Sequence, residues 1–353
     1  MITQGITGED PMSSLIIPVT TIEKLMPHNN ADSLELAQIL GWQLVVRKGE
    51  YGVGDTVVYF PIDTVLPQEL SDRFGVTNYL SKGRIRCAKL RGEPSFGLAI
   101  KPDNDAWQVG QDVAEHYMAL GVKKYEPPVR VTAGDAEVEH PLFVKYTEIE
   151  NMRNFPDIFQ EDEIVALTEK IHGTNSRVGI IEGTLMAGSH GLRRKRPADD
   201  AFETNLYWYP LSLPPVRSLL EDLATQHRQV ILFGEIYGSK VQSLNYGVTG
   251  SAGYRAFDVL LDGHYLNWPD FIRLCAQHGV DTVPVVDAIP FDFDAIKKYS
   301  DGNTLLMDDN AHIREGLVVK PLQERRDPKI GRCILKYVSD QYLFGKQSDY
   351  TDQ

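Results

Sequence analysis

The chain has 353 residues, of which 42% are hydrophobic and 24% charged, and its net charge is −13. This length suggests two domains, and the composition is that of a folded globular protein rather than a disordered or collagen-like one. No apolar run reaches the roughly 18 residues of a membrane-spanning helix, and the N-terminus lacks the basic and apolar regions of a secretory signal. Three widely spaced cysteines argue against a disulfide framework or a zinc site, and they predict a reducing, cytoplasmic location.

The acidic net charge argues against non-specific nucleic-acid binding, because phosphate contacts need local positive charge. Three basic runs stand out against this average: residues 82–91, residues 193–196 and a looser group from Arg325 to Lys336. A single run of this kind is often a solvated face, whereas three runs on an acidic chain favour a track for nucleic acid. The first run contains the residues that we expect to bind nucleic acid, namely Lys82, Arg84, Arg86, Lys89 and Arg91.

From residue 14 to residue 101, short apolar stretches rich in β-branched residues alternate with Gly and Asp turns. This pattern predicts a small closed β unit. A five-stranded barrel of the OB type suits its length and its basic strand, although a small sandwich would give the same signals. We expect a flexible tail over 1–13 and an OB-type nucleic-acid-binding module with a connecting helix over 14–125. The predicted strands are 15–19, 34–40, 43–46, 56–60, 84–90 and 96–100, and the helix is 113–120.

Beyond residue 125, strands and helices mix, which predicts an α+β domain that we place at 126–353. The predicted strands are 164–167, 178–181, 230–233 and 257–261, and the predicted helices are 219–226 and 271–278.

The most informative segment for chemistry is EKIHGTN at 169–175. Lys170 ends a predicted strand whose apolar residues indicate burial. A small turn and a second strand follow it. A lysine at the mouth of a sheet becomes nucleophilic when burial or a neighbouring cation favours the neutral amine. The spacing Lys-x-x-Gly is weak evidence alone, since residues 89–92 also match it.

Four later segments place charged or aromatic residues at strand ends: FGEIYG at 233–238, YRAFDV at 254–259, EGLVVKP at 315–321 and LKYVS at 335–339. Carboxylates hold a hard divalent cation, lysines neutralise phosphates, and an aromatic ring stacks on a base. Each such residue alone is more often a solvated charge or a core side chain. Together, and in this order, they predict a nucleotide-and-metal site.

These motifs resemble the nucleotidyltransferase motifs of ATP-dependent polynucleotide ligases. The sequences KIHGTN and FGE are most similar to those of RNA ligases of the phage nick-sealing type. The resemblance covers about residues 163–345, while segments 41–49 and 53–60 resemble the OB module that precedes the catalytic domain in one clade. It implies an N-terminal OB-type barrel followed by an adenylyltransferase domain. It also implies ATP, a divalent metal (Mg or Mn), an RNA or RNA-containing nicked duplex as partner, and a monomer.

The resemblance further implies roles for individual residues. Lys170 would be the nucleophile that forms a lysyl-adenylate, and His172 would contribute to the later steps. The implied nucleotide-binding residues are Glu169, Ile171, Asn175, Arg193, Glu235, Phe257, Lys320 and Lys336, and the implied metal ligands are Glu235 and Glu315.

The sequence departs from the family pattern at two places. His190 stands where the family usually has an arginine, so that Arg193 or Arg194 is the expected replacement. The last motif often has two lysines one residue apart, but here Ile334 precedes Lys336, and the missing charge is expected from Lys320 or Arg332.

Three alternatives remain open on sequence grounds. An mRNA-capping guanylyltransferase would use GTP, and its usual C-terminal OB domain has no counterpart in the short stretch after Lys336. An NAD-dependent ligase would need a nicotinamide-binding module where residues 1–150 indicate an OB module. A non-catalytic RNA-binding protein with a decayed transferase domain is the alternative from another functional class.

Overall fold

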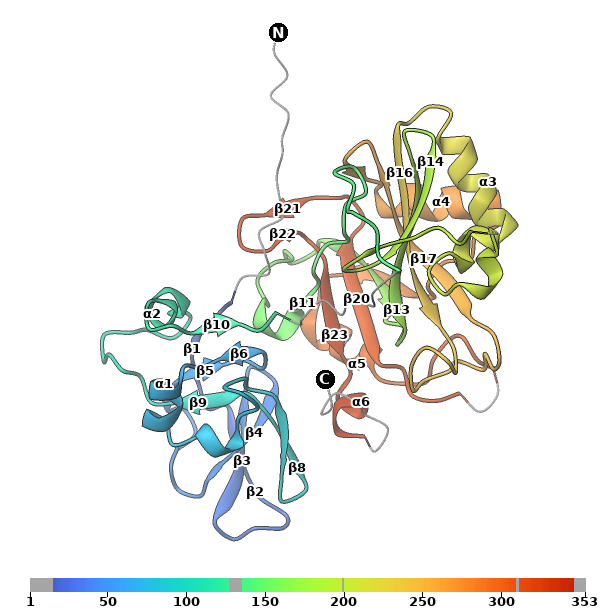
Figure 1. Cartoon of the computed structure of the whole chain (residues 1–353). Coiled ribbons are helices and arrows are strands. Elements are labelled where there is room, and N and C mark those ends of the chain that lie inside the picture. The colour runs from blue at the N-terminus through green and yellow to red at the C-terminus, as the bar shows by residue number, and fades with distance from the viewer. Residues whose placement is uncertain (1–14, 127–134, 199, 309–310, 346–353) are drawn as a thin grey trace. The chain divides into compact units, whose positions relative to one another are not determined.

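The computed structural model describes residues 15–126, 135–198, 200–308 and 311–345. The described chain forms two compact units, one before and one after residues 127–134 (Figure 1). The tail predicted over 1–13 lies outside the described residues, and the domain boundary at 125/126 stays a prediction. Within the described ranges, no helix is long and apolar enough to cross a membrane.

The N-terminal unit consists of small antiparallel sheets with the strand orders β1-β5-β9, β2-β3-β4, β7-β8 and β6-β10. The strands are β1 (Val19–Thr21), β2 (Lys24–Pro27), β3 (Leu34–Ile39), β4 (Trp42–Arg47), β5 (Thr56–Phe60), β6 (Thr64–Val65), β7 (Cys87–Leu90), β8 (Glu93–Phe96), β9 (Leu98–Ile100) and β10 (Lys123–Lys124). The helices are α1 (Gln68–Arg73), the 3-10 turn η1 (Thr77–Tyr79) and α2 (Ala114–Ala119).

Apolar residues of β1, β5, β9 and α2 share one core in this unit. Val58 and Phe60 on β5 are fully buried, and the ring of Tyr117 on α2 lies 4.7 Å from that of Phe60. The separate sheets are joined by side chains, since Gln43 on β4 donates to the carbonyl of Pro94 on β8. The strands β1, β5 and β9 therefore pack with α1 and α2 around one apolar cluster.

The predicted basic strand 84–90 is wrong in its first half, because β7 begins only at Cys87. The chain turns at Lys82 and Gly83, both with positive φ. Arg84 then forms isolated bridges to Ser81 and Val65 instead of continuing a strand.

The C-terminal unit contains two large sheets, with the strand orders β15-β14-β13-β16-β17-β18 and β11-β23-β20-β12-β19. The strands are β11 (Glu150–Asn151), β12 (Ile164–Glu169), β13 (Thr174–Ile181), β14 (Thr184–Ser189), β15 (Arg193–Arg194), β16 (Gln229–Tyr237), β17 (Gly253–Leu261), β18 (His264–Tyr265), β19 (Val285–Pro290), β20 (Gly316–Pro321), β21 (Arg326–Asp327), β22 (Gly331–Arg332) and β23 (Leu335–Val338). The helices are η2 (Met152–Asn154), η3 (Phe202–Thr204), η4 (Tyr209–Ser212), α3 (Pro214–Leu223), α4 (Trp268–His278), α5 (Phe293–Ser300) and α6 (Asp340–Phe344).

All four strands predicted for this unit are confirmed within longer observed strands. The helix predicted at 219–226 begins earlier, at Pro214, because proline suits the first turn of a helix, where its missing N–H has no partner to lose. The helix predicted at 271–278 begins at Trp268 and ends before Gly279, whose positive φ closes it. In Figure 1, α3 and α4 lie beside the six-stranded sheet.

A buried group of charges connects the two sheets. Asp258 on β17 is completely buried and accepts hydrogen bonds from the Tyr146 hydroxyl at 2.8 Å, from Arg332 Nη2 at 2.7 Å and from Lys320 Nζ on β20 at 3.2 Å. Arg332 also pairs with Glu324 at 2.5 Å. Burial raises the pKa of Asp258, but the charges of Arg332 and Lys320 outweigh it and hold this pKa below its ordinary value. The carboxylate is therefore ionised and ties β17 to β20.

We expect Asp258→Asn to destabilise the ligand-free protein by about 3–5 kcal/mol, because the buried Lys320 loses its carboxylate partner and Arg332 keeps only Glu324. The free energy of unfolding in urea measures this. Glu182→Gln is the matched control, since Glu182 pairs with Arg228 at the surface and its loss should cost less than about 1 kcal/mol. Similar small losses in both variants would contradict a linking role for Asp258.

Candidate active site

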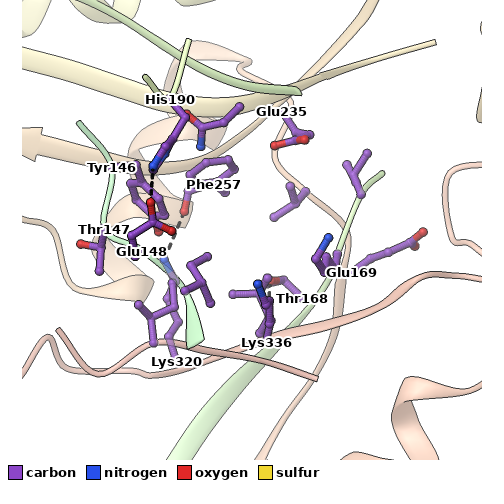
Figure 2. Close-up of a pocket in the computed structure, with 17 residues that line it drawn as sticks. Tyr146, Thr147, Glu148, Thr168, Glu169, His190, Glu235, Phe257, Lys320 and Lys336 are labelled. Carbon is purple, nitrogen blue, oxygen red and sulfur yellow. Dashed lines mark hydrogen bonds and ion pairs between the residues drawn. The ribbon is translucent and has the colours of Figure 1, made fainter. Parts of the chain in front are cut away.

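A cavity of about 240 Å³ is lined by residues from both sheets of the C-terminal unit (Figure 2). Eight of the predicted site residues line it, namely Glu169, Lys170, Ile171, Asn175, Glu235, Phe257, Lys320 and Lys336. The other lining residues are Tyr146, Thr147, Glu148, Ile149, Thr168, His190, Val283, Val318 and Ile334. The motifs that are far apart in sequence therefore meet at one place.

Lys170 follows the last residue of β12 and is fixed at both its backbone and its side chain. Its backbone N–H donates to the carbonyl of Gly316, at the start of β20, at 2.9 Å. Its Nζ lies 2.5 Å from Oε1 of Glu315, and the side chain is 26% exposed. The amine is thus held by a carboxylate and still reaches the cavity.

His172 does not line the cavity but is oriented behind it. Its Nδ1 lies 3.3 Å from Oε2 of Glu315, and its Nε2 lies 3.3 Å from Oγ of Ser243. Its backbone N–H donates to the Tyr246 hydroxyl at 2.6 Å. Burial raises the pKa of Glu315, but Lys170 and His172 outweigh burial and hold this pKa below its ordinary value. Sequence reasoning missed Ser243 and Tyr246, because they lie in a loop with no motif of their own.

Gly173 allows the turn after Lys170 to lie against β16. A Cβ at this position would be 2.3 Å from the carbonyl oxygen of Ile236 and 2.9 Å from Cγ of Glu235, so no larger residue fits without a shift. The carboxyl of Glu235 is half-buried. Burial raises its pKa to about 8; the Lys170 charge opposes this rise, while the negative charge of Glu315 adds to it.

Lys320 forms part of the cavity wall, and its amine already has partners within the protein. Its Nζ donates to the carbonyl of Phe257 at 3.1 Å and to Asp258, and it lies 4.5 Å from the ring centre of Trp268. Burial lowers the pKa of Lys320, which Asp258 opposes. The half-buried ring of Phe257 packs edge-on against Tyr146, with centroids 4.8 Å apart. Phe257 therefore combines a core contact with a face toward the cavity.

Lys336 is half-buried, and burial followed by the charge of Lys170 lowers its pKa. Of the two candidates for the missing second lysine, Lys320 lines the cavity, whereas Arg332 is not among the lining residues and is taken up by Asp258 and Glu324.

The two arginines expected to replace the family arginine are not brought to the cavity. Arg193 Nη2 pairs with Glu137 at 2.9 Å, and Arg194 lies over the ring of Tyr207 at 4.6 Å. Instead, His190 lines the cavity and its Nε2 lies 2.7 Å from Oε1 of Glu148.

The carboxylates beside Lys170 suit a cation that keeps much of its water. Within the described ranges, no group of three or more His, Cys, Asp or Glu residues is placed to hold a metal ion. Mg²⁺ typically needs one or two protein carboxylates and takes its remaining ligands from water and substrate phosphates. Burial and the nearby Glu315 charge raise the pKa of Glu235, and the charge of a bound cation would offset both effects. Glu235 and Glu315 therefore fit the predicted role.

The predicted nucleic-acid-binding residues of the N-terminal unit divide into two groups. Lys82, Lys89 and Arg91 are exposed. Arg84, by contrast, is 17% exposed, pairs with Asp63 at 2.6 Å and lies 3.7 Å above the ring of Tyr125. Arg86, the fifth of these residues, is half-buried.

The raised pKa of Glu235 predicts a pH-dependent cost to stability. Between its ordinary value of 4.5 and about 8, the folded protein keeps a proton that the unfolded chain has lost. Stability therefore falls as pH rises through this window, by up to about 1.4 kcal/mol per pH unit. Glu235→Gln removes this loss, so its stability advantage over the wild type should grow from pH 5 to pH 8 and then level off. Urea unfolding in EDTA measures the difference, and a constant difference would contradict the assignment.

Comparisons with known proteins identify the family and the fold of the chain. The RNA ligase family model matches residues 163–338, and an OB-fold domain model matches residues 16–102. Naegleria gruberi RNA ligase with pyrophosphate is 27% identical, with 94% of this chain and 98% of that chain covered and a TM-score of 0.69. A variant of that ligase with ATP and manganese has 27% identity, 94% and 98% coverage and a TM-score of 0.68. A further variant, with AMP and manganese, has 27% identity, 93% and 98% coverage and a TM-score of 0.70.

None of the curated protein sequences matches the chain. The predicted fold class, an N-terminal OB-type module followed by a nucleotidyltransferase domain, is confirmed by the two domain matches and by the similarity to solved structures. The chain therefore belongs to the RNA ligase family and carries an OB-fold domain before its ligase domain.

Proposed function

We propose that this RNA ligase uses ATP and a divalent cation to join 3′-OH and 5′-phosphate ends of RNA at nicks in duplexes. The single observation that carries the proposal is the position of Lys170, whose amine reaches the cavity and lies 2.5 Å from Glu315. The similar ligase structures that hold ATP, AMP or pyrophosphate with or without manganese support the same nucleotide.

The chemistry consists of three in-line displacements at phosphorus, in which positioning and charge neutralisation supply most of the catalysis. First, Lys170 Nζ gives up its proton and attacks the α-phosphorus of ATP, so that an N–P bond forms and pyrophosphate leaves. Next, a 5′-phosphate oxygen of the RNA attacks the same phosphorus, and the N–P bond breaks. Finally, the 3′-OH attacks the 5′-phosphorus, the phosphodiester forms, and AMP leaves.

The residues around Lys170 have two roles: some orient its amine, and others bind the nucleotide. Glu315 orients the amine, and His172 supports Glu315 from the opposite side. The ring of Phe257 stacks on the adenine, and Glu169 and Ile171 also contribute to nucleotide binding. The buried amide oxygen of Asn175 has no hydrogen-bond partner among the described residues and can accept from the nucleotide.

Glu235 and Glu315 would hold the divalent cation. When bound, such a cation neutralises negative charge on phosphate oxygens. Lys336 contributes further positive charge to the cavity. Lys320 also lines the cavity, and its pair with Asp258 holds it there.

The monomeric state and a cytoplasmic setting remain proposals from sequence. The described cysteines are free and buried, which is consistent with a reducing environment.

Lys170→Ala should abolish self-labelling by α-labelled ATP, because no other amine in the cavity has the same position beside Glu315. The variant should still unfold in one cooperative transition in urea, which shows that lost labelling is not lost folding. Lys298→Ala, on the exposed end of α5, is the control and should label normally. Labelling of the Lys170 variant would refute the nucleophile, and labelling of the wild type by GTP instead of ATP would favour a capping enzyme.

Replacing the exposed residues Lys82, Lys89 and Arg91 together with alanine should weaken binding to a nicked duplex. The slope of log affinity against log salt should fall by about 0.9 for each lost phosphate contact. Self-adenylylation should be unaffected, because these residues lie in the OB-fold domain.

The matched control changes Lys24, Lys48 and Lys101, which are exposed lysines of the same domain. Equal effects of the two triple variants on the salt slope would contradict a specific binding surface. If the Lys82, Lys89 and Arg91 variant also lost self-adenylylation, the three residues would instead be needed for folding.

A further inference from the structure

The basic residues that line the cavity differ in how firmly their partners are held. Lys320 and its partner Asp258 have side chains that are 3% and 0% exposed, and Glu315, the partner of Lys170, is 6% exposed. The pair of His190 with Glu148 is different, because these side chains are 38% and 64% exposed. Exposed pairs contribute little to stability. Of these three pairs, that of His190 with Glu148 is therefore the one most easily exchanged.

The pair joins two separate parts of the ligase domain. His190 follows the last residue of β14, whereas Glu148 lies in the segment before β11. Figure 2 shows the two side chains meeting at one side of the cavity, near Phe257 and Tyr146. Both line the cavity, so a bound nucleotide or RNA end would come close to them.

The segment that contains Glu148 is held in place without the pair of His190 and Glu148. Tyr146 is bound to Asp258 through its hydroxyl, and the carbonyl of Phe143 accepts a hydrogen bond from the buried Arg177. These buried contacts hold the chain before Glu148, and the pairing of β11 with β23 holds it after Glu148. The pair with His190 is therefore not what holds this segment in place.

The charge of Glu148 is opposite to what phosphate binding needs. It pairs with His190, and its charge also acts on Lys336, though less than the charges of Glu150 and Glu315 do. A phosphate near these groups would be repelled by Glu148 and attracted by both of them. Binding is most favourable if the phosphate takes the place of the carboxylate and Glu148 turns toward solvent.

We propose that Glu148 is a counter-ion that a phosphate group of the ligand replaces on His190. The Nε2–H that donates to Glu148 would then donate to a phosphate oxygen, which is possible for an imidazolium or for the neutral ring protonated on Nε2. The inference rests on the proposed function, since it takes the ligand to be ATP or the 5′-phosphate of an RNA strand. Glu148 thus weakens phosphate binding, and His190 strengthens it.

The first arm of the test measures the dissociation constant of α,β-methylene-ATP with magnesium by calorimetry, because its P–C bond prevents adenylyl transfer. Glu148→Gln should bind it about two- to five-fold more tightly, and His190→Ala should bind it more weakly by a similar factor. In the double variant the gain from Glu148→Gln should be smaller than in the single variant, because only the part that acts through His190 is lost. His190→Gln, which keeps a donor near Nε2, should recover part of the loss. Adenosine, which has no phosphate, should bind all variants equally.

The second arm uses adenylylated protein and a nicked RNA duplex with a 5′-phosphate, and measures the RNA concentration that gives half-maximal single-turnover discharge. A response in this arm alone assigns the contact to the strand phosphate, and a response in the first arm alone assigns it to ATP. The control is His227→Gln, because His227 forms an exposed pair with Asp262 at 2.8 Å away from the cavity lining.

Unchanged or weaker binding by Glu148→Gln in both arms, with a wild type that binds normally, would overturn this inference alone. Equal changes in adenosine binding would also overturn it, because they would show a structural role. A wild type that binds no α,β-methylene-ATP would contradict the proposed function itself.

Discussion

The carboxylate of Asp258 is buried between the two sheets of the ligase domain, and the cavity depends on how its charge is balanced. It is held by Arg332 and by Lys320, which belong to the part of the chain that forms the opposite sheet and its β21–β22 hairpin. A buried carboxylate is stable only when cations and hydrogen bonds surround it. This requirement fixes the distance between β17 and β20, and these two strands carry Phe257 and Val318 on the walls of the cavity.

The same balance of charges distinguishes the two carboxylates beside Lys170. Glu315 contacts Lys170 and His172, so its pKa stays low, whereas burial beside Glu315 raises the pKa of Glu235. Environments that push the pKa values of neighbouring groups apart are a feature of functional sites. Glu315 therefore favours its ionised form and orients the amine, whereas Glu235 becomes ionised most readily when a cation is near.

The sequence predicts the components of the site better than their contacts. Strand patterns and motif order are local, so β5, β12 and the lining positions of Lys170 and Glu235 follow from them. Contacts between distant segments leave no periodic signal. The pairing of Arg193 with Glu137, the partners Ser243 and Tyr246 of His172, and the start of β7 at Cys87 depend on tertiary packing, which overrides local propensity.

The most direct test of the account is to locate the covalent adenylate. Wild-type protein incubated with ATP and magnesium would be digested at neutral pH, and mass spectrometry would identify the peptide that carries one added AMP. The account predicts the modification on Lys170, in the peptide containing residues 169–175, with ATP and not with GTP. No adenylate, or an adenylate on another lysine, would contradict the central claim that Lys170 is the nucleophile.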